Sequence, residues 1–268
     1  MTDQKTAGPD LAATIANRQA VAGTATASDL VESMRGEFGK VLPASLPIDT
    51  FLRLALTELR QTPELQRCTA DSLLGALMTA ARLGLEPGGP LGHFYLTPRN
   101  VYNRSLNGGS GGKEWQVVPI VGYKGLVELA RKSGRVGDVS ADLVREGDEF
   151  RMGYDSTRGG RFIVWDPADY LEERPVVGVL ASADLTGGGR QVRYLPISKV
   201  LERKARGAAG DKGPWASDRD AMIRKTGIRA LAGDLPASSE LRLAVAVDEE
   251  VQRYVPGEVV DEGTGELS

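Results

Sequence analysis

Residues 115–134, WQVVPIVGYKGLVELARKSG, change from a strand pattern to a helix pattern within one short segment. Trp115–Val121 is an apolar run of the length typical of a strand. Gly122 and Tyr123 then begin a helix that continues to about Ser133. We expect Gly122, at the junction, to need a backbone conformation that a β-branched residue cannot adopt. The segment predicts a domain in which strands and helices pack together.

On either side of this segment, the apolar pattern predicts helices toward both ends of the chain and strands in the middle. The order is that of an α+β fold, with a helical N-terminal part, a central antiparallel β-sheet with hairpins, and a helical C-terminal part. The predicted helices are 28–40, 48–60, 72–83, 123–133, 198–206, 217–233 and 238–247. The predicted strands are 93–97, 115–121, 136–146, 161–165, 176–184 and 191–195. The candidate helix caps are Ser28 or Asp29, Thr69 or Asp71, Ser198 and Ser217.

The two ends of the chain differ in composition from the part between them. Residues 1–27 are rich in Ala, Thr and Gly without an apolar period, which predicts a mobile arm. Residues 248–268 hold seven acidic residues and one basic residue, net −6, and few apolar ones. We therefore expect one folded domain over 28–247, followed by an acidic tail that does not pack as part of the core.

Composition excludes several classes of protein. The 268 residues are 41% hydrophobic and 26% charged, as in folded soluble proteins. No apolar run approaches the ~18 residues of a membrane span, and no signal segment opens the chain. The single cysteine, Cys68, excludes a disulfide framework, and the single histidine, His93, excludes most zinc ligand sets. We expect a soluble cytoplasmic protein without metal or cofactor.

Charge is distributed unevenly along the chain. Residues 190–229 carry eleven basic and four acidic residues, net +7, whereas residues 138–173 carry four basic and ten acidic residues, net −6. A cationic segment of this size is typical of a surface that binds a polyanion. The alternative is that these charges are ordinary solvated faces of helices and strands.

Basic residues recur at helical spacing on three of the predicted helices. Residues three, four or seven positions apart lie close together around a helix, at 100° per residue, so their side chains form stripes. Stripes on three helices can line a groove that follows a phosphate backbone. The alternative is salt bridging, because Glu128 precedes Lys132 by four residues and Glu202 adjoins Arg203. The candidate phosphate contacts are Lys124, Arg131, Lys199, Arg203, Arg206, Lys212, Arg224, Lys225 and Arg229, with Arg190 and Arg193 in the same stretch.

Two aromatic residues and a group of carboxylates suggest further roles. Tyr123 and Trp215 adjoin basic residues and could stack on bases, although such rings more often anchor loops or the core. Four carboxylates, Asp142, Glu146, Asp148 and Glu149, could bind a cation as in a metal-dependent nuclease, or could simply line a surface turn.

Several ordered blocks of the chain resemble the RecT family of phage single-strand DNA annealing proteins. The resemblance covers about 45–247, although residues 99–114 are richer in glycine than the short link typical of the family. The matching blocks are LGLEPG (83–88), LGHFYL (91–96), IVGYKGLVELARKSG (120–134), VREGDEF (144–150), PW (214–215), MIRKTGIR (222–229) and LP (235–236).

The resemblance implies a recombination protein of the bacterial host cell that anneals DNA without nuclease or ATPase activity. Such proteins coat single-stranded DNA, assemble into rings or helical filaments, and pair the coated strand with its complement. The family also implies a phage exonuclease and the host single-strand-binding protein as partners. A protein that protects single strands without annealing them is one alternative, and a metal-dependent nuclease is another.

Overall fold

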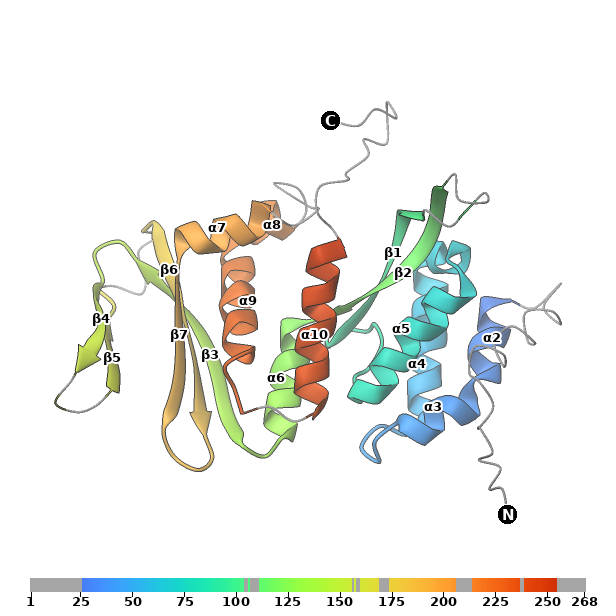
Figure 1. Ribbon diagram of the computed structural model, residues 1–268, viewed down its shortest axis with the longest axis horizontal. Coiled ribbons are helices and arrows are strands. Elements are labelled where there is room, and N and C mark those ends of the chain that lie inside the picture. Colours follow the sequence, from blue (N-terminus) through green and yellow to red (C-terminus); the bar gives the residue numbers. More distant parts are fainter. Residues whose placement is uncertain are drawn as a thin grey trace, which may run out of the picture. The chain divides into compact units, whose positions relative to one another are not determined.

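The computed structural model describes residues 26–103, 106, 111–155, 157, 160–168, 174–205, 214–236 and 239–254 (Figure 1). Helices and antiparallel strands are combined, as the α+β prediction required. The chain divides into two compact units, residues 1–120 and residues 121–268. Most of the predicted N-terminal arm, residues 1–25, lies outside the described residues, so that prediction stays untested.

The first unit is mainly helical. Helix α4 buries Phe51, Leu52, Ala55 and Leu59 on the apolar stripe that its sequence predicts, and the ring of Phe51 lies 5.5 Å from that of Phe38. Strands β1 and β2 pair with each other. The elements of the unit are α2 (Ala27–Ser33), α3 (Arg35–Val41), α4 (Ile48–Gln61), the short 3-10 helix η1 (Pro63–Arg67), α5 (Ala70–Leu83), β1 (Phe94–Asn103) and the greater part of β2 (Gly112–Val121).

The start of the first helix differs from the prediction. Thr26, and not Ser28 or Asp29, is the N-terminal cap: its hydroxyl accepts a hydrogen bond from the Asp29 N–H, and the Asp29 carboxylate accepts one from the Thr26 N–H. Asp29 thus closes the capping box from its third position. The predicted helix 28–40 is divided, since α2 ends at Ser33 and α3 begins at Arg35.

Helix α5 ends where the sequence predicts. Gly84 has a φ of 62°, and a Cβ atom there would lie 2.5 Å from Cγ of Pro43, so only glycine fits. At its other end the helix is tied to β2, because the Thr69 N–H donates to the Trp115 carbonyl and the Val117 N–H donates to Ser72 Oγ.

The second unit contains a three-stranded antiparallel sheet of order β3-β6-β7. Its central strand places Val179 opposite both Leu143 and Leu195, and these buried residues form one core cluster with Val200 and Ile223. The strands are β3 (Val136–Arg145), β6 (Val176–Leu185) and β7 (Arg190–Pro196). A separate hairpin, β4 (Glu149–Asp155) with β5 (Gly160–Asp166), lies beside this sheet in Figure 1. The sequence predicted β5 but missed β4.

Helix α9 packs against all three strands of the sheet. A Cβ atom on its Gly227 would lie 2.7 Å from a methyl carbon of Val179, so the helix approaches the sheet as closely as glycine permits. Asp218, and not Ser217, caps this helix by accepting a hydrogen bond from the Ala221 N–H. The helices of the unit are α6 (Tyr123–Lys132), α7 (Ile197–Ala205), α8 (Pro214–Ser217), α9 (Arg219–Ala232) and α10 (Ser239–Tyr254).

Two further predictions about this unit were wrong. Gly122 precedes α6 with a φ of −67° and a ψ of 153°, an extended conformation that β-branched residues also adopt. Helix α10 continues to Tyr254, beyond the predicted end at 247, and so includes the first residues of the segment assigned to the acidic tail. None of the helices within the described residues is both long and apolar enough to cross a membrane.

Candidate nucleic-acid interface

Three of the predicted phosphate contacts lie close together in the second unit. Arg203 comes from α7, and Lys225 and Arg229 come from α9. The pKa of Arg229 is lowered to about 10, mainly by burial and in addition by the charge of Arg203. The pKa of Lys225 is lowered as well, mainly by burial and in addition by the charge of Arg229. We call Arg203, Lys225 and Arg229 the cationic cluster. Because all three are positive, the cluster is an electrostatically unfavourable arrangement that an anion would relieve.

The local sequence explains the position of this cluster. Lys225 and Arg229 are four residues apart, so they lie about 40° apart around α9, and Gly227 lies nearly opposite them. Gly227 contacts Val179 of the sheet, and Ile223 is buried in the same core. The apolar face of α9 therefore holds the helix on the sheet, and the two cations lie on its other side.

Helix α7 contributes further basic residues. Lys199 is exposed and paired with Glu202 at 2.9 Å, and the Lys204 amine lies 5.5 Å from the centre of the Trp215 ring. Trp215 also packs against the core cluster, which accounts for this ring without DNA. Sequence reasoning overlooked Lys204, although it is the only other basic residue of the helix. Stacking of Trp215 on a base stays a prediction.

The remaining predicted contacts are more dispersed. Lys124 and Arg224 are exposed on α6 and α9, and Tyr123 is half-buried at the first position of α6. Arg131 is exposed but pairs with Asp138 at 3.0 Å. Arg206 and Lys212 lie outside the described residues. A groove formed by all three helices therefore stays a prediction.

Two basic residues of the cationic segment are paired within the protein. Arg190 forms two hydrogen bonds to the Asp184 carboxylate, and Arg193 contacts Asp234 at 3.1 Å. The first pair could have been anticipated, because Asp184 and Arg190 are directly opposite in the hairpin that turns at 187–189. Arg145, from the neighbouring acidic segment, likewise pairs with Asp220 at 2.7 Å.

Comparison with known proteins identifies the family. The model of the RecT family matches residues 49–262. Protein RecT of Escherichia coli (strain K12) is 37% identical over 219 residues, which cover 81% of this chain and 77% of that protein. The uncharacterized protein YqaK of Bacillus subtilis (strain 168) is 25% identical over 201 residues, 71% of this chain and 61% of that protein. This chain belongs to the RecT family.

Membership confirms the central part of the function that the resemblance implied. RecT-family proteins bind and anneal single-stranded DNA in recombination and form oligomers, and this describes the present chain. The family match includes every member of the cationic cluster and extends past residue 247 to residue 262.

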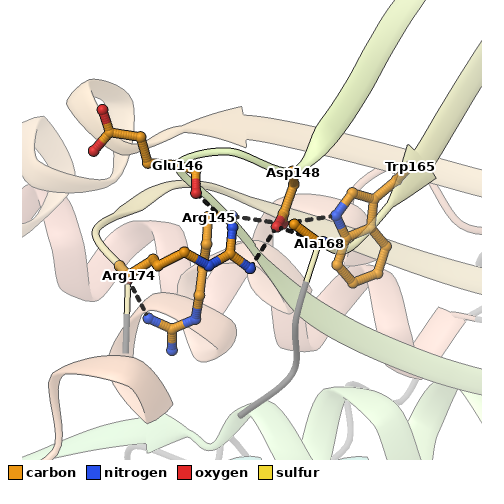
Figure 2. Close-up of polar contacts among 6 residues, drawn as sticks. All are labelled: Arg145, Glu146, Asp148, Trp165, Ala168 and Arg174. Carbon is orange, nitrogen blue, oxygen red and sulfur yellow. Dashed lines mark hydrogen bonds and ion pairs between the residues drawn. The ribbon is translucent and has the colours of Figure 1, made fainter. Parts of the chain in front are cut away.

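In this RecT-family chain, Asp148 has a structural role. Figure 2 shows its carboxylate at the base of the β4–β5 hairpin, surrounded by donors from three segments. Oδ2 accepts from the Arg145 N–H at 2.9 Å and the Trp165 indole at 3.0 Å, and Oδ1 accepts from Arg174 at 2.9 Å and the Ala168 N–H at 3.3 Å. Burial alone would raise the pKa of Asp148, but these donors lower it to about 2.

The same contacts argue against a metal site formed by these carboxylates. Asp148 is only 1% exposed, and both of its oxygens already accept two hydrogen bonds. Glu149 pairs with Arg151 at 3.2 Å. Among the described residues, no three His, Cys, Asp or Glu side chains gather closely enough to hold a metal ion.

The single cysteine is not activated as a nucleophile. Burial raises the pKa of the Cys68 thiol, which disfavours the reactive thiolate.

Proposed function

We propose that this chain anneals DNA without a nucleotide cofactor and that the cationic cluster is the centre of its phosphate-binding surface. The observation that carries the proposal is the cluster itself: three like charges from two helices lie together, and burial and mutual repulsion lower the pKa values of Arg229 and Lys225. With a pKa of about 10, Arg229 still carries its charge near neutral pH. A strand of phosphates would remove the repulsion among the three charges.

We propose that further basic residues extend this surface along the strand. Lys124 and Arg224 are exposed, and Arg131 and Lys199 have only surface ion pairs to exchange for phosphate. Such pairs are each worth at most about 1 kcal/mol, so a phosphate can replace the carboxylate at little cost. Arg206 and Lys212 complete the proposed set, with Tyr123 and Trp215 as stacking partners for bases.

Phosphate contacts suit annealing better than base contacts do. Contacts to the backbone carry no sequence information and leave the base edges exposed for Watson–Crick pairing. Lys and Arg side chains also reduce the repulsion between the bound strand and its incoming complement. Since base pairing and stacking release free energy, the reaction needs no nucleotide hydrolysis.

We propose that the oligomer is a head-to-tail ring or filament on DNA, because successive subunits on one strand repeat the same contact in one direction. A phage exonuclease would supply the single strand, and the host single-strand-binding protein would be displaced from it or recruited to it.

The decisive experiment combines a binding assay with an annealing assay. Complementary labelled oligonucleotides are mixed with the protein in the absence of nucleotide, and pairing rate and strand integrity are followed together. If about six phosphates are neutralised per binding unit, log affinity plotted against log salt has a slope of about −4. A nearly flat response would contradict the phosphate model, and tight binding without faster pairing would indicate a strand-protecting protein.

A double variant then tests the location of the surface. Lys225→Ala with Arg229→Ala should weaken binding to all oligonucleotide sequences alike and make the salt slope shallower by about 1.4, at about 0.7 for each lost phosphate contact. Arg190→Ala is the matched control, since Arg190 lies in the same basic segment but is held by Asp184. Equal effects of the two changes would place the phosphate surface elsewhere.

A further inference from the structure

Arg99, on strand β1 of the first unit, is a cation that the fold leaves without an acceptor. Its Nε atom is buried and has no hydrogen-bond partner, and no carboxylate of the described residues pairs with its guanidinium. Glu114 is the one acidic residue between positions 94 and 121, and its Oε1 accepts hydrogen bonds from Asn103 at 2.7 Å and Gln116 at 2.6 Å. A buried donor without an acceptor is costly, so a ligand that supplied one would stabilise this arrangement.

Two further cations beside the β1–β2 strand pair are not paired with any carboxylate of the described residues. Arg67, in η1, is exposed, and its guanidinium carbon lies 4.6 Å from the centre of the Trp115 ring of β2. Lys113 is exposed on β2. Unpaired cations on an exposed surface favour an anionic ligand.

Two tyrosines of β1 are exposed and are held in place by glycines. Tyr95 and Tyr102 are 44% and 55% exposed. The Tyr95 hydroxyl lies 2.6 Å from the place that a Cβ atom on Gly92 would take, and the Tyr102 hydroxyl lies in the space of a Cβ atom on Gly111. Each ring is therefore fixed at its hydroxyl end. A ring that is already fixed loses little conformational entropy when a ligand stacks on it.

Unpaired cations and exposed rings together indicate a single-stranded nucleic acid as the ligand. Bases stack on aromatic side chains while Lys and Arg bind the phosphates, and both contacts tolerate any base sequence. Tyr95 and Arg99 lie on the same side of β1, about 13 Å apart, because they are an even number of residues apart in a strand. The β4–β5 hairpin lacks this combination: Tyr154 is 67% exposed, but the neighbouring Arg151 pairs with Glu149 at 3.2 Å.

We propose that the β1–β2 strand pair is a second DNA-binding surface, in which Tyr95 and Tyr102 stack on the bases of a single strand and Arg99 binds its phosphate. The proposal rests on the proposed function and adds contacts in the first unit to those of the cationic cluster in the second. Stacking covers the faces of the bases and leaves their Watson–Crick edges free, so it is compatible with annealing.

Photochemical cross-linking tests the base contact directly. An oligonucleotide that carries 5-bromodeoxyuridine in place of thymidine is bound to the full-length protein and irradiated, and the cross-linked peptides are identified by mass spectrometry. We expect cross-links at Tyr95 or Tyr102 and none at Tyr154, although Tyr154 is the most exposed of the three. Equal cross-linking of all three tyrosines, or none on β1, would overturn the proposal.

Binding measurements separate the stacking from the charge. Tyr95→Leu with Tyr102→Leu should weaken oligonucleotide binding by about tenfold or more at every salt concentration without changing the salt slope, because uncharged contacts release no counterions. Tyr95→Phe with Tyr102→Phe keeps both rings and should bind like wild type. Arg99→Gln should make the slope shallower by about 0.7, whereas Arg99→Lys should keep it. Tyr154→Leu is the matched control and should change neither affinity nor slope.

The same samples distinguish a failure of this surface from a failure of the proposed function, once melting curves establish that each variant is folded. If the variant with both tyrosines changed to Leu binds like wild type, the proposal is overturned, and a change confined to assembly would assign the strand pair to a protein contact instead. If only Lys225→Ala with Arg229→Ala loses affinity, the proposed function stands without the second surface. If wild type itself binds no single strand, the proposed function fails.

Discussion

Replacing Arg229 by methionine should make the protein more stable and worse at binding DNA. Arg229 is partly buried on α9, and burial together with the charge of Arg203 lowers its pKa to about 10. Methionine keeps a long, flexible side chain of similar bulk but removes the charge. The same change also removes the repulsion that Arg229 exerts on Lys225.

The size of both effects follows from the structure. The lower pKa of Arg229 corresponds to at most about 3 kcal/mol of unfavourable interaction for the charged form. Loss of the other interactions of the guanidinium reduces the net gain to about 1–2 kcal/mol, or roughly 2–8 °C in melting temperature for a chain of this size. A lost charge-assisted contact to phosphate costs about 1.5–3 kcal/mol, which weakens binding by roughly tenfold or more.

Thermal unfolding and titration of a labelled oligonucleotide at several salt concentrations measure the two effects on one sample. The salt slope should become shallower by about 0.7. Arg229→Lys, which keeps the charge, should retain most of the binding, and Arg190→Met should change neither property strongly. A variant that is less stable than wild type yet has the same affinity and slope would refute the reasoning, since Arg229 would then be a structural residue.

Three further outcomes can be tested directly. Asp148→Asn should destabilise the second unit by about 3–5 kcal/mol in chemical denaturation, because it leaves Arg174 buried without its carboxylate. The folded-state pKa of Asp148, about 2, lies below its ordinary value of 3.8. The ionised carboxylate therefore adds about 2 kcal/mol to the free energy of unfolding above about pH 4, and this contribution is lost as the pH falls toward 2. The Asp148→Asn variant should lack this acid-induced loss of stability. Gly227→Val should lower the melting temperature by the equivalent of about 1–3 kcal/mol through its clash with Val179, whereas Gly75→Ala, with open space around it, should raise it slightly. Deleting 255–268, which carries four acidic residues and no basic one, should leave the melting temperature unchanged and binding at low salt equal or tighter; unfolding would mean that the tail is part of the domain.

Features that depend on neighbouring residues could be predicted from the sequence. The apolar stripe of α4 is buried as expected, and α5 ends at Gly84, where a helix-ending glycine adopts a positive φ. The first helix cap was predicted wrongly because several neighbouring residues could each serve as the cap. Ser28 and Asp29 are both good caps, but Asp29 is better used at the third helical position to close the box with Thr26.

Strand β4 was missed although its residues alternate as in a half-buried strand. Its apolar residues Phe150, Met152 and Tyr154 are separated by Arg151 and Gly153. The strand was overlooked because the acidic residues around its start were interpreted as a surface turn.

For the candidate site, too, the sequence predicted one part of the arrangement and missed another. Helical spacing correctly brought Lys225 and Arg229 together, but it gave no information on which cations are neutralised by residues distant in sequence, such as Asp234 beside Arg193. The net charge of +7 over 190–229 therefore overstates the charge available to DNA. What distinguishes the cationic cluster is the proximity of Arg203 on another helix, which only the fold establishes.

Stability and binding place opposite demands on the two sides of α9. The side that includes Gly227 and Ile223 is packed against the sheet as tightly as the backbone allows, while Lys225 and Arg229 remain in an environment that disfavours their charge. Tight packing on one side prevents the helix from moving to relieve repulsion on the other. Under the proposed function this repulsion is released when phosphate binds, so we expect the rigidity of the α9–sheet contact to contribute to DNA affinity as well as to the fold.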